Sequence, residues 1–212
     1  ERPVTSPPGT PPGTPPASPQ SARLEALMAA VRESGGRGPA PVEKWDPPDC
    51  GDMDMRIGAD GTWFYMGSPI GRPALVRLFA SVLAREGERF VLKTPVEKIG
   101  ITVDDAPFLA VEMAEEVGET GPILVVRTNL DDLVRIGPGH DLRFAPGERE
   151  GELVPYVHVR RGLEARFTRA LAYDLAEKGE VRDGEAEPMF GVASQGVFYP
   201  MMPARALDLA GS

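Results

Sequence analysis

The chain has very little cysteine and histidine, and this excludes several kinds of site. Cys50 is the single cysteine among 212 residues, so an internal disulfide framework cannot form. A reducing compartment suits such a chain, and we expect it to be cytoplasmic. His140 and His158 are the two histidines, and the sequence contains neither a Cys-x-x-Cys nor a His-Glu-x-x-His motif. We therefore expect no metal site.

The sequence also lacks long apolar runs and an excess of positive charge. No stretch approaches the roughly 18 apolar residues of a membrane-spanning helix, and no secretory apolar segment is visible. The formal net charge is −9. This charge argues against a general nucleic-acid-binding protein, because such proteins need a basic surface to displace counterions from phosphates. A small basic pocket is still compatible with it. We expect neither a membrane span nor a nucleic-acid partner.

Proline and glycine, in contrast, are abundant, and much of the proline lies in residues 1–21. There PPGT, PPGT and PPAS follow one another. Such a segment has no apolar surface to repay the cost of ordering, so we predict a disordered tail; docking to a proline-recognition domain is the alternative. Residues 22–44 are expected to form a linker and a short amphipathic helix, since Leu27 and Val31 lie at helical spacing.

An aromatic hairpin opens residues 45–103, which we assign to an N-terminal domain. A predicted strand at 53–57 and its partner at 62–66 flank the pair Asp60-Gly61. This pair favours a type I′ turn, in which both central residues take positive φ.

A helix is predicted after this hairpin. Pro73 suits the first turn of a helix and Gly87 suits its end. Between them one apolar stripe indicates the buried face, and it consists of Leu75, Leu78, Phe79, Val82 and Leu83. Short strands are expected at 89–93 and 97–103.

Residues 104–212 have the pattern of a second domain, dominated by antiparallel strands. Apolar and polar residues alternate in strands predicted at 108–117, 123–128, 133–136, 142–144 and 153–160. A helix is expected at 163–178. Its buried face would be formed by Leu163, Phe167, Leu171 and Leu175. A last hairpin over 191–202 turns at Gln195-Gly196.

A weak internal similarity raises the question of domain duplication. Placing Gly87 on Gly179 also aligns Phe79 with Leu171, so that two helix ends coincide. Such a match is compatible with a duplicated unit and also with chance.

Several runs together resemble a proteobacterial family known only as a domain of unknown function. The runs are WDPPDCG (45–51), DGTW (60–63), GSPI (67–70) with Arg72, LVRLF (75–79), TPVEK (94–98), VDDAPF (103–108), TN (128–129) and VRRGLE (159–164). The resemblance covers roughly residues 45–202. It implies a duplicated core, a C-terminal half superficially like a pleckstrin-homology fold, and a crevice between the halves that is proposed to take a nucleotide-like ligand in signalling.

The fold class follows from the strand pattern and the resemblance together. We predict an α+β fold of two small domains, each an antiparallel β-sheet with a helix. The order of several strands followed by one helix makes the C-terminal domain similar to a pleckstrin-homology-like fold.

Candidate ligand-binding residues lie in both predicted domains. Trp63 and Tyr65 share one face of a strand and could stack on a base; packing against a neighbouring helix is the alternative. Arg72 precedes a predicted helix start, where free N–H groups favour a phosphate, so it could act as a clamp. An ordinary ion pair or a solvated arginine is the alternative for Arg72.

The other candidates lie at strand ends and on one strand face. Asp104 and Asn129 belong to acidic turns, which either contact a ligand or simply form Asx turns. With the neighbouring aspartates they could hold a hard cation. Tyr156, His158 and Arg160 share one face of a strand, and this polar face lines either solvent or the crevice.

Three functions are compatible with these features. The favoured one is a small-ligand-binding module in signal transduction, with a nucleotide-like or phosphate-bearing ligand between the domains. The second is a peptide or protein adaptor that pairs a strand along a sheet edge. The third is a metal-assisted hydrolase using the aspartate turns. We expect a binding protein rather than an enzyme, with no cofactor beyond a nucleotide-like ligand, a signalling protein as a partner, and an exposed edge that would allow a homodimer.

Overall fold

The computed structural model describes residues 19–34, 38–149 and 151–210. The predicted disordered tail falls almost wholly outside these residues. Where the prediction reaches residue 19 it is wrong, because α1 (Pro19–Ser34) begins there. The expected amphipathic helix is confirmed, since Leu27 and Val31 are fully buried on one face of α1. None of the described helices is long and apolar enough to cross a membrane.

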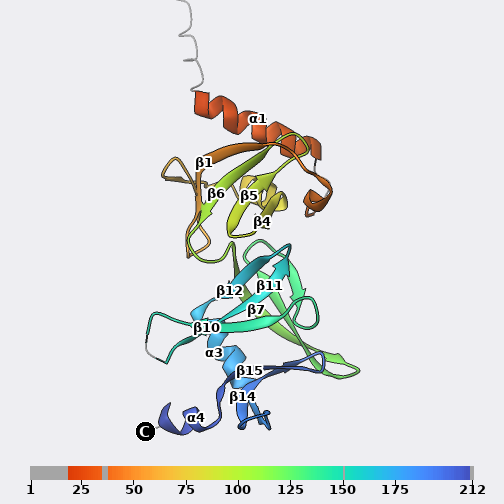
Figure 1. The fold of residues 1–212 in the computed structure, drawn as a ribbon, viewed down its shortest axis with the longest axis vertical. Helices are drawn as coiled ribbons and strands as arrows, with labels where there is room; N and C mark the ends of the chain where they lie inside the picture. The colour runs from red at the N-terminus through yellow and green to blue at the C-terminus, as the bar shows by residue number, and fades with distance from the viewer. Residues whose placement is uncertain (1–18, 35–37, 150, 211–212) are drawn as a thin grey trace, which may run out of the picture.

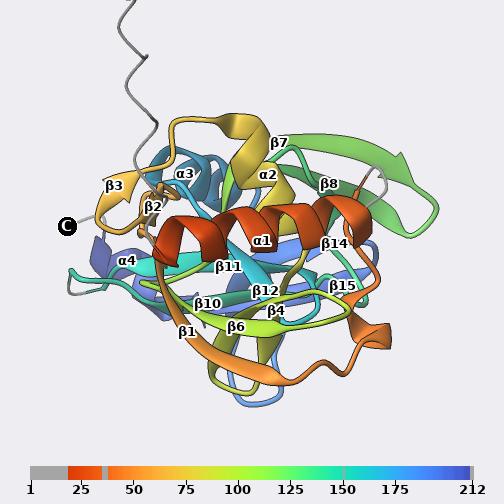
Figure 2. The ribbon, with the colours of Figure 1, turned by 90° about the horizontal axis from the view of Figure 1, so that it is seen from above.

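The N-terminal domain is a six-stranded sheet with helices against it. After α1 and the short 3₁₀ turn η1 (Val42–Lys44), its elements are β1 (Asp49–Ile57), β2 (Trp63–Tyr65), β3 (Ser68–Pro69), α2 (Pro73–Ser81), β4 (Leu83–Glu86), β5 (Arg89–Lys93) and β6 (Lys98–Val103). The strand order is β3-β2-β1-β6-β5-β4. Figure 2 shows α1 crossing over α2, and the two helices are in contact.

The C-terminal domain contains a second six-stranded sheet and a smaller three-stranded one. Its elements are β7 (Phe108–Gly118), β8 (Gly121–Thr128), β9 (Leu133–Arg135), β10 (Leu142–Pro146), β11 (Leu153–Arg160), β12 (Leu163–Phe167), α3 (Arg169–Glu177), β13 (Glu180–Arg182), β14 (Met189–Ser194), β15 (Val197–Pro203) and α4 (Arg205–Ala210). The two domains follow one another along the longest axis of the molecule, with α1 at one end (Figure 1). The α+β class and the two-domain organisation are thus confirmed.

The two large sheets have the same topology. The second sheet has the order β10-β11-β12-β7-β8-β9. Read from the other end and numbered within its own domain, this is 3-2-1-6-5-4, the same order as in the first sheet. In both sheets the first and sixth strands of the domain pair in parallel at the centre, and every other pairing is antiparallel. This shared order supports duplication of one unit. The match of Gly87 with Gly179 is a different alignment, because α2 follows the third strand of its domain whereas α3 follows the sixth.

The predicted exclusively antiparallel pattern is therefore wrong at one position in each sheet. The sixth strand of each large sheet returns beside the first after four intervening strands, and it runs in the same direction. The likeness to a pleckstrin-homology fold stays a prediction.

The helices α2 and α3 are both shorter than their apolar stripes predict. The helix expected to reach Gly87 ends at Ser81, and Leu83 begins β4, which pairs with β5. The helix expected at 163–178 begins at Arg169. Leu163 and Phe167 lie in β12, whose buried and exposed residues alternate. Residues four positions apart lie on the same face of a helix and also on the same face of a strand. Apolar spacing alone could therefore not separate the two.

The turn at Asp60-Gly61 also differs from the prediction. Gly61 has φ of 80°, but Asp60 is not among the residues with positive φ. The loop is longer than two residues, because the N–H of Gly58 donates to the carbonyl of Thr62. The carboxylate of Asp60 accepts from the N–H of Thr62 at 2.9 Å. The type I′ assignment fits Gln195-Gly196 instead, where φ is 50° and 75°.

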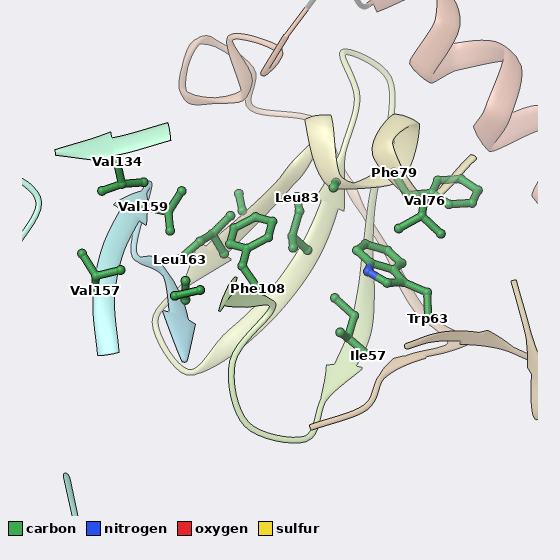
Figure 3. Close-up of a cluster of buried hydrophobic side chains, with 14 of the residues drawn as sticks. Ile57, Trp63, Val76, Phe79, Leu83, Phe108, Val134, Val157, Val159 and Leu163 are labelled. Carbon is green, nitrogen blue, oxygen red and sulfur yellow. The ribbon is translucent and has the colours of Figure 1, made fainter. Parts of the chain in front are cut away.

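The core runs without a break across the domain boundary. Figure 3 shows Trp63 packed with Val76 and Phe79 of the first domain, while Leu83 lies beside Phe108, where the second domain begins. Leu163 and the inward residues of β11 extend the same cluster (Figure 3). The relative position of the domains is therefore stabilised by apolar contact and not only by a linker.

Candidate functional site

A cleft lies where α2 of the first domain meets the β8–β9 turn and the end of β11 in the second. We call it the interdomain cleft. It has a volume of about 310 Å³ and is lined by Gly38, Pro39, Ala74, Arg77, Leu78, Ala80, Ser81, Leu130, Asp132 and Arg160. Arg160 is the one residue predicted as a ligand contact that lines this cleft.

Arg160 is held from three sides. Its Nη1 donates to Oδ1 of Asp132 at 2.5 Å, and its Nη2 donates to the carbonyl of Ala80 at 3.2 Å. The guanidinium carbon lies 4.8 Å from the centroid of the Phe108 ring, a cation–π distance. Its Nε–H, however, is buried and has no hydrogen-bond partner among the described residues. One donor of this cleft-lining guanidinium is thus buried without a hydrogen bond to the described residues.

A second cation stands at the rim of the cleft. Nη2 of Arg77, on α2, donates to Oδ2 of Asp131 at 2.5 Å across the domain boundary. Asp131 also accepts from Arg127 at 3.0 Å. The hydrogen bond from Arg77 is the main cause that holds the pKa of Asp131 below its usual value. The rim is therefore a small charge network, in which Arg77, Arg127 and Arg160 pair with Asp131, Asp132 and, through Arg127, Glu112.

Arg161 fastens the two domains beside the cleft. It takes positive φ of 52° in the β11–β12 turn, which aims its side chain at the first domain. Its guanidinium donates to the carbonyls of Ala40 and Ser81 and lies 3.3 Å from the carboxylate of Glu43. Burial lowers the pKa of Arg161. Arg160 and Arg161 together bind three backbone carbonyls of the first domain, so one turn sets the width of the cleft.

The two aromatic candidates do not reach the interdomain cleft. Trp63 is 1% exposed and stacks on Phe79 with ring centroids 6.4 Å apart. This position favours the core-packing interpretation, and its indole N–H is buried without a hydrogen-bond partner in the described part of the chain. Tyr65 is half-buried and packs against the same core. Burial raises the pKa of its phenol.

The structure places the predicted polar candidates apart from one another. Arg72 is exposed at the N-cap of α2, with Pro73 in the first turn as expected, and it does not line the interdomain cleft. Asp104 forms an ion pair with Arg56. Asn129 is structural, because its Oδ1 accepts from the N–H of Leu109 at 2.9 Å and its own N–H donates to the Leu109 carbonyl at 2.8 Å.

His158 fixes the turn that carries the two cleft arginines. Its Nδ1 donates to the carbonyl of Gly139 at 2.8 Å, and its Nε2 accepts from the N–H of Gly162 at 3.1 Å. The ring of His140 stacks beside it, with centroids 6.0 Å apart. Both ring nitrogens of His158 are thus occupied within the protein. Its role in this geometry is to position the β11–β12 turn rather than to contact a ligand.

The aspartate turns give no support to a cation site. Asp104 pairs with Arg56, Asp105 with Arg166, Asp131 with Arg77, and Asp132 with Arg160. No group of three metal-ligating carboxylate, thiolate or imidazole side chains occurs within the described ranges. Each of these carboxylates therefore already has a guanidinium partner, which removes the feature that suggested a metal-assisted hydrolase.

Sequence reasoning missed Arg77, Asp132 and Arg161 as parts of this site. Arg77 and Arg161 belong to runs quoted above for the family resemblance, and Asp132 belongs to one of the acidic turns named as possible cation ligands, but their patterns are those of a solvated helix face and ordinary turns. Only the packing of α2 against the β8–β9 turn brings Arg77 and Asp132 to one cleft.

Comparison with known proteins gives one consistent family. Residues 40–106 match the model of the N-terminal domain of DUF1285, a domain of unknown function, and residues 107–201 match its C-terminal domain. A crystal structure of a DUF1285 family protein from Silicibacter pomeroyi is 49% identical, with a TM-score of 0.78 over 86% of this chain and 97% of that one. A DUF1285 protein from Shewanella baltica is 27% identical, with a TM-score of 0.47 over 59% of this chain and 91% of that one. No curated protein matches the chain.

Proposed function

The chain belongs to the DUF1285 family, and from this premise we propose that it is a small-ligand-binding module whose interdomain cleft takes the phosphate-bearing end of a nucleotide-like ligand. The proposal includes the role in signal transduction that the family resemblance implies. It describes binding and not catalysis, because the described residues of the cleft offer no nucleophile with an adjacent base.

The unused Nε–H of Arg160 is the observation that carries this proposal. A buried donor without a partner costs about 1–3 kcal/mol, and more when it belongs to a charged group. An anion that entered the cleft and displaced the groups covering this N–H would remove that cost. Guanidinium groups bind phosphate and carboxylate through two parallel N–H···O bonds, and Nε with one Nη is one of the two available pairs.

Binding would proceed by exchange of partners. Asp132 occupies Nη1 of Arg160 in the absence of ligand, so a phosphate competes with this carboxylate for the same guanidinium. Arg77 lies at the rim with its side chain 53% exposed, where it can receive a second oxygen of the ligand.

The size of the cleft limits what enters it. Ligand pockets in proteins usually measure about 300–1,000 Å³, and the interdomain cleft, at about 310 Å³, is at the lower end of this range. A phosphate with its attached sugar is a reasonable occupant, with the remainder of the ligand extending over Gly38 and Pro39.

Titration calorimetry with the full chain tests the proposal. The panel is AMP, ADP, ATP, cyclic AMP and GMP, with adenosine and inorganic phosphate as partial ligands. We expect at least one nucleotide to bind and adenosine to bind more weakly. At free ligand 100 times the Kd, the nucleotide should stabilise the fold by about 2.7 kcal/mol.

Two variants assign the binding to the cleft. Asp132→Asn removes the competing carboxylate and should lower the Kd for the phosphate-bearing ligand, whereas Arg160→Lys keeps the charge but loses the planar fork and should raise it about tenfold or more. Arg182→Lys is the matched control, because Arg182 pairs with Glu180 on the distant third sheet. Absence of binding by every nucleotide, or identical affinities for all four proteins, would refute the cleft as the site.

A peptide adaptor is the second candidate, and the exposed edge at β13 favours it. All three residues of β13 are exposed, Val181 is 53% exposed, and among the described strands only β14 pairs with β13. An extended peptide can add a strand to such an edge. A binding partner lost with Val181→Pro but retained with Arg160→Lys would favour the adaptor, since proline removes a backbone donor.

A further inference from the structure

A larger groove lies along α3, lined mainly by residues of the C-terminal domain together with Ala59 of the N-terminal domain. We call it the α3 groove. It measures about 590 Å³ and shares no lining residue with the interdomain cleft. In Figure 1, α3 lies between the second sheet and the β14–β15 hairpin, and both elements contribute walls to this groove.

The sequence of α3 explains why a groove exists here. Leu171 and Leu175 point into the core and are buried. Ala172 and Ala176, which directly follow these two leucines in the sequence, line the groove. Short side chains at these positions leave a hollow where longer ones would close against the neighbouring strands.

The walls of the α3 groove are mainly aliphatic. Val154 is buried at its base, on β11, and the half-buried Met201 and Met202 come from β15. Methionine side chains are flexible and polarisable, so they adapt to an apolar ligand of varying shape. The volume is that of a small-molecule pocket. An aliphatic body of a small molecule is the occupant that this lining fits.

The rim of the groove is cationic although the chain carries a net charge of −9. Arg149, Arg166 and Arg169 line it, and only Arg166 has an ion pair, with Asp105 at 3.0 Å. Arg169 donates to the hydroxyl of Tyr173 at 3.2 Å. Neither Arg149 nor Arg169 forms an ion pair with any carboxylate of the described residues.

Among the described residues, Glu152 is the one acidic residue that lines the α3 groove, and it forms no ion pair with Arg149 or Arg169. The pKa of Arg169 is raised by the hydrogen bond to Tyr173 and, to a smaller extent, by the charge of Glu152. Its carboxylate accepts from the backbone N–H of Arg149 at 3.2 Å. It is thereby held within its own turn. The groove thus joins an apolar interior to a rim with two guanidinium groups that form no ion pair with a carboxylate in the described part of the chain.

From this combination we propose that the α3 groove binds a small aliphatic carboxylate of fatty-acid type, with its chain against Met201, Met202 and the α3 alanines and its carboxylate at Arg149 and Arg169. Planar guanidinium groups match a carboxylate through paired hydrogen bonds. This site is independent of the nucleotide-like ligand proposed for the interdomain cleft.

Titration calorimetry of the full chain with decanoate, below its critical micelle concentration, tests this proposal. Decanol has the same aliphatic chain without the charge and serves as the second probe. We expect decanoate to bind at least about tenfold more tightly than decanol, because hydrogen bonds to charged groups are the stronger ones. No binding of decanoate, or equal binding of the two probes, overturns the proposal.

Three variants separate the two parts of the site. Arg169→Gln should weaken decanoate about tenfold and leave decanol unchanged. Ala172→Leu fills the groove and should abolish binding of both probes. Arg135→Gln, outside the groove, should change neither. The melting temperature of each variant without ligand shows that it is folded. Unchanged decanoate binding in both Arg169→Gln and Ala172→Leu overturns the assignment. Nucleotide binding is measured in parallel, so failure of either site is recognised separately.

Discussion

Ser194 provides the sharpest test of how the small third sheet is held on the second. The side chain is fully buried at the end of β14. Its Oγ accepts from the N–H of Leu124 at 2.9 Å and donates to the carbonyl of Ile136 at 2.7 Å. One hydroxyl thus satisfies the hydrogen-bonding needs of two backbone groups of the second sheet. Leu124 and Ile136, which carry these groups, are also buried.

Ser194→Ala removes the hydroxyl while changing the shape very little. The N–H of Leu124 and the carbonyl of Ile136 would then lack a side-chain partner in a site without solvent access. An unsatisfied buried group costs about 1–3 kcal/mol, so we expect a loss of about 2–4 kcal/mol in the free energy of unfolding. For a chain of this size such a loss lowers the melting temperature by at least about 4 °C.

Urea denaturation followed by circular dichroism measures this loss. Ser34→Ala is the control, because the hydroxyl of Ser34 donates only to the carbonyl of Ala30 within α1, and its removal leaves no unpaired donor. We expect the control to cost less than about 1 kcal/mol. If Ser194→Ala costs no more than the control, water replaces the hydroxyl and the third sheet is not fastened by this residue.

Two further predictions concern aromatic residues. Trp63→Phe should lose only about 1–2 kcal/mol of stability in urea denaturation, because the phenyl ring fills much of the site and the lost indole N–H is unpaired, whereas Trp63→Ala leaves a larger cavity and should lose about 3–5 kcal/mol. A loss of about 3 kcal/mol or more for Trp63→Phe would mean that this N–H has a partner. Burial, with help from Asp141, raises the pKa of Tyr199 to about 12. Since an unfolded tyrosine titrates near pH ~10, the unfolded state loses its proton first, and stability should fall as pH rises from about 10 to 12. Asp141→Asn should narrow this window, as ultraviolet titration of the phenol would show.

The strands and the aromatic hairpins could be predicted from the sequence because their signals are local. Alternating apolar residues placed β5, β6, β7, β8 and β11 nearly at their observed bounds. Gly196 indicated the last turn, since glycine takes positive φ without strain. Leu27 and Val31 indicated α1 in the same way.

The ends of α2 and α3 could not be predicted in this way. Leu83 and Leu163 continue the apolar spacing of the adjacent helices, yet both belong to strands. In each case the backbone hydrogen bonds of a neighbouring strand replace one more helical turn, since Leu83 pairs with Leu92 of β5 and Leu163 pairs with Arg160 of β11. The spacing of apolar residues within the segment does not show that such a partner strand is present.

The amino-acid sequence by itself determined the α+β class, most strands, and the candidate role of Arg160, because these depend on residue type and on spacing over a few residues. Only the tertiary structure decided that Trp63 is enclosed in the core, that the aspartates are neutralised by arginines, and that Arg77 and Asp132 share a cleft with Arg160. The reason is physical: burial and ion pairing depend on which surfaces meet, and these surfaces come from parts of the chain that lie apart in the sequence.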